Sequence, residues 1–336
     1  MWAAGRLALD GDPAAAYDWT AHKAAEVRAL GHDFKDYYGW HYPPPALFFA
    51  VALATLPYLV AMLGWLAATL AVYALAIGRI LGGRFGVLFA LGFPAGTWNI
   101  TAGQNGFLTA ALIGGTLGFL ERQPVLAGLC LGLLTYKPQF GLLFPLALIA
   151  DRRRLTLAIA AAVAIAMAAM SWLAFGSASW DAFLHWLPIT SRVVLGEGAA
   201  SWFRLQSVFG LIRAHGGSET SAWTAQIVLT LALAAGIVVL WRSRAAFELK
   251  AAALAAATPL ATPYLYMYDL PTLGVAIAFL LRFCLRNGFN QIEIAALIAA
   301  GALILIYPYV ETHVGFAAAV IVMAVITRRA CTAPAA

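Results

Sequence analysis

The sequence predicts an all-α, polytopic integral membrane protein, and two observations lead to that fold class. Hydrophobic residues make up 63% of the 336 residues and charged residues only 11%, whereas soluble domains contain about 25% charged residues. Apolar runs recur almost to the C-terminus, at about the 17 to 25 residues that cross a bilayer as a helix. The runs lack the alternation of barrel strands, so helices must satisfy their backbone in hydrocarbon.

The breaks between apolar runs divide the chain into an N-terminal segment and a helical bundle. Residues 1–57 are expected to form an extracytoplasmic loop with juxtamembrane helices, and residues 58–336 a transmembrane bundle, in a single domain overall. A bundle of about 11 helices is expected. The expected helices are 58–80, 86–98, 104–120, 124–136, 138–150, 155–175, 222–241, 248–262, 270–286, 291–307 and 313–327.

Several of these helices are too short to cross the membrane alone. Segments 124–136 and 138–150, like 86–98, would span about 20 Å at 1.5 Å per residue, against roughly 30 Å of hydrocarbon. Irregular backbone at membrane depth is tolerated only where it lines protein or water. The breaks at 103–106 and 136–138, with Pro263, are therefore expected to open onto an outward-facing cavity.

The distribution of charge orients the bundle. One set of connections carries 13 basic and 4 acidic residues, a net of +9, which leaves 8 basic and 11 acidic residues on the other side. Lys and Arg mark cytoplasmic loops, so the first set is assigned to the cytoplasm. Eleven crossings then place the C-terminus in the cytoplasm, in keeping with Arg328 and Arg329. The polar residues Arg204 and Gln206 fall on the outer side.

Lys137 lies near the middle of a long apolar stretch, in "LTYKPQFG". It could be an interfacial lysine that extends its ammonium to the headgroups. Alternatively it binds an anion, because a lysine is a compact charge suited to a phosphate and Pro138 bends the chain toward the cavity.

Two further polar groups belong to the expected outer cavity, together with His41 and Tyr42. In "TAGQNGF", Gln104 and Asn105 could cap the following helix or bind sugar hydroxyls. In "ATPYLYMYDLP", an acid follows three tyrosines that form either an interfacial aromatic belt or a surface for the C–H side of a sugar. The acid requires a partner in that setting. These residues are Tyr264, Tyr266, Tyr268 and Asp269.

The acidic residues of the N-terminal segment are weaker candidates. Asp10 and Asp12 have the spacing by which soluble nucleotide-sugar transferases hold a divalent metal, but between glycine and proline they are better explained as a turn. No metal site is expected. Asp33 and Asp36, near the membrane and among aromatics, are fallback candidates for a catalytic base, with a solvated loop as the alternative.

Four motifs resemble glycosyltransferase family 87, the polyprenyl-phosphate-sugar-dependent hexosyltransferases of the GT-C superfamily. They are "HYPPPALFFAVALATLP", "GQNGFLTAALIGG", "LTYKPQFGLLFPL" and "ATPYLYMYDL". Their order along the whole chain makes the resemblance more specific than any one motif. It implies a bacterial cytoplasmic (inner) membrane enzyme that acts on the extracytoplasmic face without a metal or cofactor, since the lipid-linked sugar is a substrate.

The resemblance also implies a catalytic aspartate, and it shows one place where this sequence departs from the family's pattern. In such enzymes an aspartate followed by aromatics at the outer end of the first span is the expected base. Here "MWAAGRL" resembles the tail of that motif, with Trp2 as its closing Trp, so the aspartate and a first helix are expected before Met1. Tyr266 and Tyr268 stand where many members have Trp and His, which casts doubt on any role that needs an imidazole there.

The expected reaction moves a hexose, of the mannose-like class, from a polyprenyl-phosphate sugar to a glycolipid or glycan acceptor. Lys137 would stabilise the leaving phosphate, and the partners are these lipids and the bilayer, with no nucleic acid. The alternatives are a secondary transporter, whose broken helices and buried charges would look similar, and a surface-polysaccharide polymerase or ligase. The absence of an inverted repeat counts against a transporter, and a polymerase or ligase would need a larger external loop than 176–221.

Overall fold

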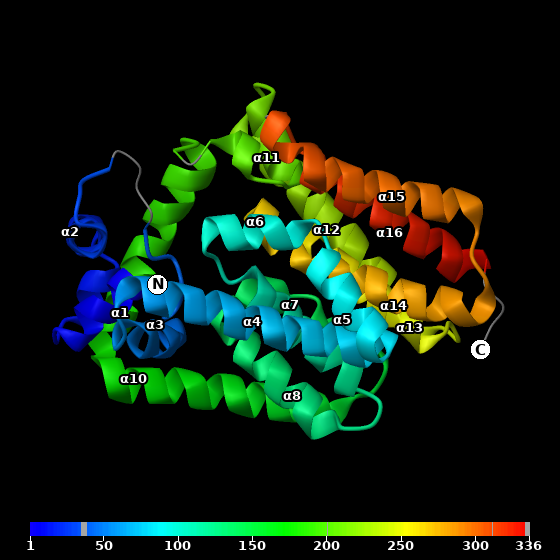
Figure 1. The fold of residues 1–336 in the computed structure, drawn as a ribbon, viewed down its shortest axis with the longest axis horizontal. Helices are drawn as coiled ribbons and strands as arrows, with labels where there is room; N and C mark the ends of the chain where they lie inside the picture. Colours follow the sequence, from blue (N-terminus) through cyan, green and yellow to red (C-terminus); the bar gives the residue numbers. More distant parts are fainter. Residues whose placement is uncertain (35–38, 200, 311, 333–336) are drawn as a thin grey trace.

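A computed structural model describes residues 1–34, 39–199, 201–310 and 312–332, and throughout these residues the regular structure is helical. Figure 1 shows the helices, most of which run along the long axis of the molecule. The α-helices are α1 (Trp2–Leu9), α2 (Trp19–Leu30), α3 (Leu47–Ala54), α4 (Tyr58–Leu81), α5 (Gly83–Gly92), α6 (Ala95–Ala102), α7 (Gly106–Phe119), α8 (Pro124–Leu133), α9 (Phe144–Ala150), α10 (Arg154–Ser191), α11 (Val208–Ala214), α12 (Glu219–Arg242), α13 (Phe247–Leu260), α14 (Pro271–Asn287), α15 (Gln291–Ile306) and α16 (Val314–Thr332).

The all-α membrane fold expected from composition is confirmed. Six of the described helices are long and apolar enough to cross a bilayer, namely α4, α10, α12, α14, α15 and α16 with their short flanking turns. The other apolar helices of the bundle are shorter, as the sequence indicates for 124–136 and 138–150. A protein with several spans of this kind is a polytopic membrane protein.

Two expected helices have different bounds in the structure. The expected 86–98 segment is two helices, α5 and α6, because Phe93 adopts an extended backbone before Pro94. The expected 155–175 helix continues to Ser191, so much of the expected 176–221 loop is helical. At Gly176 the backbone has φ +74°, a conformation that glycine adopts without a steric penalty. The chain changes direction there and continues as a helix (Figure 1).

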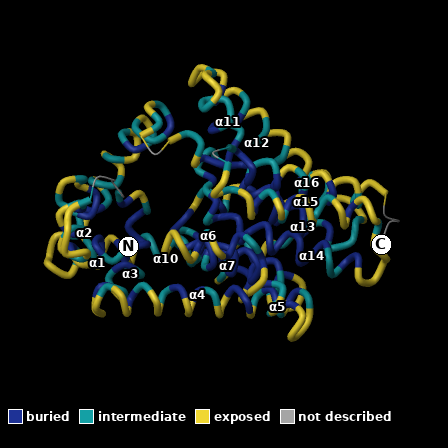
Figure 2. Tube along the Cα trace, turned by 45° about the horizontal axis from the view of Figure 1, so that its top comes forward, coloured by how far each residue is buried: buried dark blue, intermediate teal, exposed yellow. Residues whose placement is uncertain are grey.

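The centre of the bundle is formed by α7, α13 and α14, most of whose residues are buried. Figure 2 shows this buried centre surrounded by helices with one exposed side, such as α4. The alanine-rich α13 packs closely on α14 and α16 because small side chains let helix backbones approach. The exposed sides of the outer helices carry large apolar residues, including Leu75 at 69% and Ile165 at 69% exposure, which suits contact with lipid tails.

The N-terminal segment docks on one end of the bundle. Helix α1 packs against α3, and the Trp2 indole nitrogen donates a hydrogen bond to the Leu56 carbonyl (2.9 Å). A Cβ on Gly5 would lie 1.9 Å from the Ala50 carbonyl oxygen, so glycine permits this close contact. The segment thus contains short helices that pack on the bundle.

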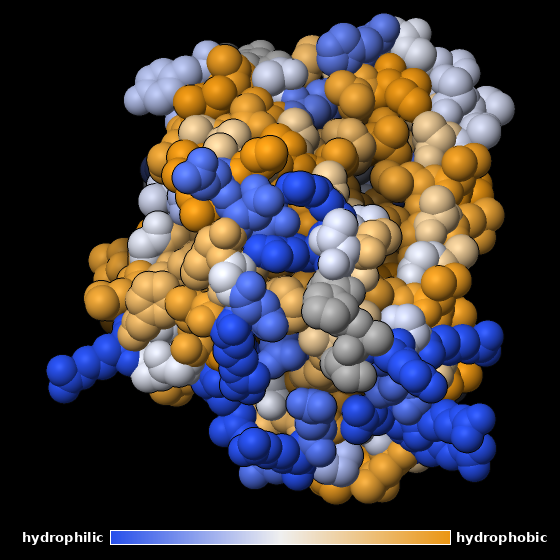
Figure 3. All heavy atoms as spheres, turned by 90° about the vertical axis from the view of Figure 1, so that its right-hand side faces the viewer, coloured by the Kyte–Doolittle hydropathy of each residue, from blue (hydrophilic) through white to orange (hydrophobic). Residues whose placement is uncertain are grey.

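The opposite end of the bundle, called the basic end below, is where α4, α14 and α16 finish and α15 begins. Figure 3 looks onto this end and shows hydrophilic residues gathered on it, with apolar residues on its flanks. The charges include Arg79, Arg282, Arg286 and Arg329. This clustering is the structural basis for the proposal that the basic end faces the cytoplasm.

A pair of glycines lets α8 pack on α10. Gly128 and Gly132 are four residues apart on one side of α8, and Cβ atoms there would lie 2.6 Å from Ile159 and 2.4 Å from Val163. Any side chain at these positions must therefore separate the helices. The spacing is that of the small-residue contacts by which membrane helices approach closely.

We predict that Gly132→Ala lowers the stability of the fold, by about 1–3 kcal/mol, because the added methyl overpacks the α8–α10 contact. The measurement is the midpoint of thermal unfolding in detergent. Gly236→Ala on α12 is the matched control, since a Cβ there meets nothing within 4 Å. Equal midpoints for the two variants would contradict the packing argument.

Candidate functional site

Three breaks in helices meet at one place in the bundle. They are the α6–α7 break at 103–105, the break at Lys137, and the segment 261–270 between α13 and α14. The last contains a short 3₁₀ turn, Met267–Asp269, that packs against α6 and α7. The breaks expected from the sequence at 103–106, 136–138 and Pro263 are therefore present, and the tertiary structure brings the first two against the last.

At this meeting point the Lys137 ammonium forms an ion pair with the Asp269 carboxylate. The two side chains are 4% and 0% exposed. Burying either charge alone would be very costly, and the pair with further hydrogen bonds removes most of that penalty. The partner that Asp269 requires is thus Lys137, a pairing across 132 residues of sequence.

A line of hydrogen bonds runs from this pair toward solvent. Lys137 Nζ donates to Asn105 Oδ1 (3.1 Å), and Asn105 Nδ2 donates to the Tyr42 hydroxyl (2.8 Å). The Tyr42 hydroxyl in turn donates to Gln104 Oε1 (3.4 Å). Lys137, Asp269 and Asn105 are buried, whereas Tyr42 and Gln104 are partly exposed. We call these five residues the buried ionic network, and its last two members face the accessible side.

Asn105 occupies the N-cap position of α7, but its side chain makes no capping hydrogen bond. The interpretation of Asn105 as a helix cap therefore does not describe its side chain, which bridges Lys137 and Tyr42 instead. The orphan Gly106 amide donates to Asn99 Oδ1 on α6 (2.7 Å). Sequence reasoning missed Asn99, although an asparagine inside an apolar segment was a signal.

The other oxygen of Asp269 accepts a hydrogen bond from the Tyr266 backbone amide (3.4 Å). This orients the segment that carries the three tyrosines, each of which is partly exposed. The rings of Tyr266 and Tyr268 stack with centroids 5.2 Å apart at 7°. The Lys137 ammonium lies 5.3 Å from the Tyr268 ring centroid, within cation–π range.

Tyr136 and Thr109 support the network from below, and sequence reasoning missed both. Their hydroxyls lie 2.5 Å apart, so one donates to the other, and both lie within hydrogen-bond distance of the Asn105 carbonyl oxygen, at 3.3 and 3.2 Å. A Cβ on Gly106 would lie 1.7 Å from the Tyr268 carbonyl oxygen, so only glycine allows α7 to begin against the tyrosine segment.

A second segment fixes the tyrosines from the outside. The Gln206 backbone N–H donates to the Leu265 carbonyl (2.6 Å), and the Ser207 hydroxyl donates to the Pro263 carbonyl (2.9 Å). These bonds place exposed Arg204 beside the tyrosines. Arg204 lies close enough to Tyr266 for its positive charge to act on the phenol. Throughout the described chain, Arg204 has no acidic partner.

The remaining candidates lie apart from this network. His41 is exposed, and its Nδ1 lies 3.3 Å from the Thr190 hydroxyl on α10. Asp33 is 81% exposed, in an ion pair with Lys23 and a hydrogen bond from the Phe34 amide. Asp36 lies outside the described residues. Tyr264 packs with the small apolar cluster around Leu205.

The network lies at membrane depth, beneath the end opposite the arginines. Helix α7 descends 14 residues from Gly106 and α14 17 residues from Pro271, which at 1.5 Å per residue is about 21 to 25 Å. Both lengths are shorter than the roughly 30 Å of the hydrocarbon core, and from this we infer that the network lies at membrane depth. Lys137 lies at the junction of two short helical segments, as the sequence indicates.

In this geometry, the polar groups of Tyr42 and Gln104 lie at the accessible edge of the buried ionic network. The Tyr42 phenol accepts a hydrogen bond from Asn105 and donates one to Gln104. An amide and a phenol side by side can donate to and accept from sugar hydroxyls, and partly exposed tyrosine rings can contact the apolar side of a sugar. The full burial of Asp269 and its pairing with Lys137 exclude it as the base that takes a proton from an acceptor.

Comparison with known proteins identifies one family. Residues 40–263, two thirds of the chain, match the model of glycosyltransferase family 87. No curated protein and no solved structure matches the chain. The matched range includes Tyr42, the α6–α7 break and Lys137, and it ends just before the three tyrosines.

We predict that the Lys137–Asp269 pair behaves as a unit. Lys137→Met alone or Asp269→Leu alone should destabilise the fold by about 3–5 kcal/mol, because each leaves a buried charge unpaired. The double variant should regain most of that loss, since no charge remains. The measurement is a double-mutant cycle from unfolding midpoints in detergent. Additive losses would show that the two side chains do not interact.

Proposed function

This chain belongs to glycosyltransferase family 87, and on that premise we propose that it transfers a hexose from a polyprenyl-phosphate sugar to a glycolipid or glycan acceptor. The transfer takes place on the face of the cytoplasmic membrane opposite the basic end. The observation that carries the proposal is the line of hydrogen bonds from buried Lys137 to the partly exposed Tyr42 and Gln104. It presents sugar-binding groups at a depth that a lipid-linked substrate can reach.

In the proposed reaction the acceptor hydroxyl attacks the anomeric carbon of the donor sugar. The new glycosidic C–O bond forms as the bond from that carbon to the phosphate oxygen breaks, and polyprenyl phosphate leaves with the electron pair. The hydroxyl proton passes to a carboxylate base, a contribution of about 10² to 10⁴-fold in rate. Tyr42, Gln104 and the tyrosines orient the sugar for this displacement.

Lys137 is a positioning residue in this proposal. Its ammonium is held by Asp269 and Asn105, so a direct contact with the leaving phosphate would require the buried pair to open. What Lys137 does in the structure is hold Asn105, which in turn holds the Tyr42 hydroxyl. A neutral pair beneath the site also avoids placing a net charge in the low-dielectric interior.

We assign the contact with the donor phosphate to Arg204. Its side chain is exposed beside the tyrosine segment, and its guanidinium can bind phosphate oxygens in a bidentate manner. A backbone hydrogen bond from the neighbouring Gln206 to Leu265 and a side-chain hydrogen bond from Ser207 to Pro263 keep this segment against the tyrosine segment. The cation therefore lies on a fixed support close to the groups that would hold the sugar.

We predict that Tyr42→Phe lowers hexose transfer by about tenfold or more, because the ring remains while the hydroxyl that joins Asn105 and Gln104 is lost. The measurement is transfer of label from radiolabelled polyprenyl-phosphate hexose by purified protein in liposomes. Tyr309→Phe, which removes a hydroxyl from a ring that is 87% exposed, is the matched control. Solute uptake without any sugar transfer by the unaltered protein would contradict the proposed function.

We also predict that Arg204→Gln raises the KM for the lipid-linked donor more than it lowers kcat, by about tenfold or more, because a charge-assisted bond to the phosphate is lost. Arg28→Gln on α2, which removes another exposed arginine, should leave both values unchanged. An unchanged KM in Arg204→Gln would assign the phosphate to other residues.

A further inference from the structure

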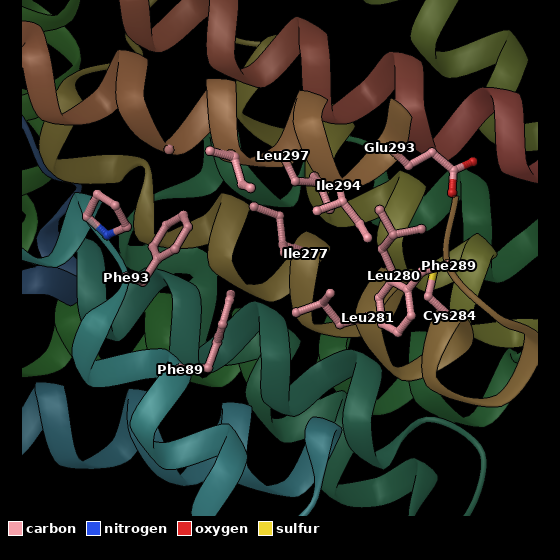
Figure 4. A pocket seen from close by; sticks show the side chains of 13 residues that line it. Phe89, Phe93, Ile277, Leu280, Leu281, Cys284, Phe289, Glu293, Ile294 and Leu297 are labelled. Carbon is pink, nitrogen blue, oxygen red and sulfur yellow. The ribbon is translucent and has the colours of Figure 1, made fainter. Parts of the chain in front are cut away.

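A second candidate binding site lies outside the buried ionic network, between α14 and α15. These helices are consecutive in sequence, but α15 packs mainly on α16 and leaves an apolar groove of about 440 Å³ beside α14. This volume is within the range of small-molecule sites. Figure 4 shows side chains from α14, α15 and the α5–α6 region pointing into the groove. Its lining includes Phe89, Phe93, Ile277, Leu280, Ile294 and Leu297.

The groove opens toward lipid. Residues on its α15 side continue onto the outer surface of the bundle, where Ile294 is 41% and Ile298 67% exposed. Phe289, at the turn between the two helices, is 46% exposed. A surface of this composition at membrane depth contacts acyl chains, and an elongated apolar groove in it suits one chain.

One end of the groove is charged. Glu293 lines it there and pairs with Arg329 (2.8 Å) and Arg328 (3.9 Å). Figure 4 places Glu293 beside Cys284, at the opposite end from Phe93. The groove therefore extends from the apolar middle of the bundle to the basic end.

More arginines lie at the same level of the bundle. On α14, Arg282 and Arg286 share Glu248 (3.4 and 3.1 Å). Arg282 also donates to the Ile80 carbonyl at the end of α4 (3.3 Å), next to the start of α5.

The charge around this end is positive overall. Arg84 stands in the first turn of α5 and is exposed, and among the described residues it has no acidic partner. Four arginines, Arg282, Arg286, Arg328 and Arg329, share the two glutamates Glu248 and Glu293, and Arg84 adds a fifth positive charge, which gives a net of +3. Arg286 and Arg328 are 65% and 48% exposed, so their guanidinium groups are accessible.

We propose that this groove binds an anionic glycerophospholipid from the leaflet at the basic end. One acyl chain lies in the groove between α14 and α15, and the phosphate contacts the guanidinium groups of Arg84, Arg286 and Arg328. Basic pockets between membrane helices at the cytoplasmic side recognise anionic headgroups in this way. A neutral lipid would fill the groove but leave the excess positive charge without a partner.

The charge pattern distinguishes this ligand from the sugar donor. Ile277, where the groove begins on α14, is eight residues beyond Asp269, or about 12 Å along the helix. A donor with its phosphate near the network would enter from that uncharged end. Its chain would then point toward the arginines and leave their excess positive charge without an anionic partner. The proposed lipid instead places its charge at the charged end, and the inference does not rest on the proposed function.

The test measures which lipids stay bound. Purified protein is reconstituted in nanodiscs of equal phosphatidylglycerol and phosphatidylcholine, extracted, and analysed by native mass spectrometry. The unaltered protein should retain phosphatidylglycerol selectively. Arg84→Gln with Arg286→Gln should lower that retention about 30-fold, the factor for two arginines near a membrane surface. Arg242→Gln with Arg244→Gln is the matched control, since these exposed arginines lie at and just after the C-terminal end of α12, which does not line the groove.

A second variant tests the acyl chain separately. A Cβ on Gly301 would meet only Pro94, at 3.9 Å, so Gly301→Leu projects into the groove with little strain. It should lower retention of every lipid at this site, whereas Gly236→Leu on α12 should not.

Three results would overturn the proposal. The first is equal retention of the two lipids by the unaltered protein. The second is unchanged lipid retention in both the Arg84→Gln, Arg286→Gln variant and the Gly301→Leu variant. The third is displacement of the bound lipid by polyprenyl phosphate. Sugar transfer, measured on the same preparations, reports on the proposed enzyme activity independently.

Discussion

The buried ion pair between Lys137 and Asp269 is the interaction on which the candidate site depends. Both charges lie at membrane depth, where either alone would be costly. Each group therefore uses its available partners: the lysine donates to Asn105, and the carboxylate accepts from the Tyr266 amide. Because these partners come from three separate breaks in helices, the pair fixes the breaks relative to one another. Loss of one charge would release the whole arrangement rather than a single contact.

Broken helices at this depth serve the site in two ways. Their ends leave backbone groups that cannot remain unpaired in hydrocarbon, and the structure satisfies them locally, as when Asn99 accepts from the Gly106 amide. The same breaks put short polar side chains where a continuous helix would present only apolar ones. Tyr42 and Gln104 are thereby held at the accessible edge of the buried ionic network, whose other members are closed to solvent. A lipid-linked sugar could meet such groups without leaving the membrane.

The two ends of the bundle carry different chemistry. The end near the network presents tyrosines and the exposed Arg204, on a segment joined to Leu265 by a backbone hydrogen bond from Gln206. The basic end presents arginines that outnumber the glutamates they share, next to the groove between α14 and α15. Substrate recognition and lipid recognition would then occupy opposite leaflets. Helix α14 links them, since it begins beside Asp269 and ends beside Arg286.

Composition and apolar periodicity by themselves determined that this chain is an all-α membrane protein, because hydrocarbon allows few other ways to satisfy a backbone. They also located the breaks at Lys137, Gln104 and Pro263, since glycine, proline and polar residues interrupt an apolar helix wherever it lies. The family resemblance, on four short motifs, is confirmed by the match over residues 40–263. Only the tertiary structure decided that Lys137 pairs with Asp269, that Asn105 bridges rather than caps, and that α10 continues past Gly176. The physical reason is that these outcomes depend on contacts between residues far apart in sequence, or on whether a glycine bends a helix or ends it, and no local pattern contains that information.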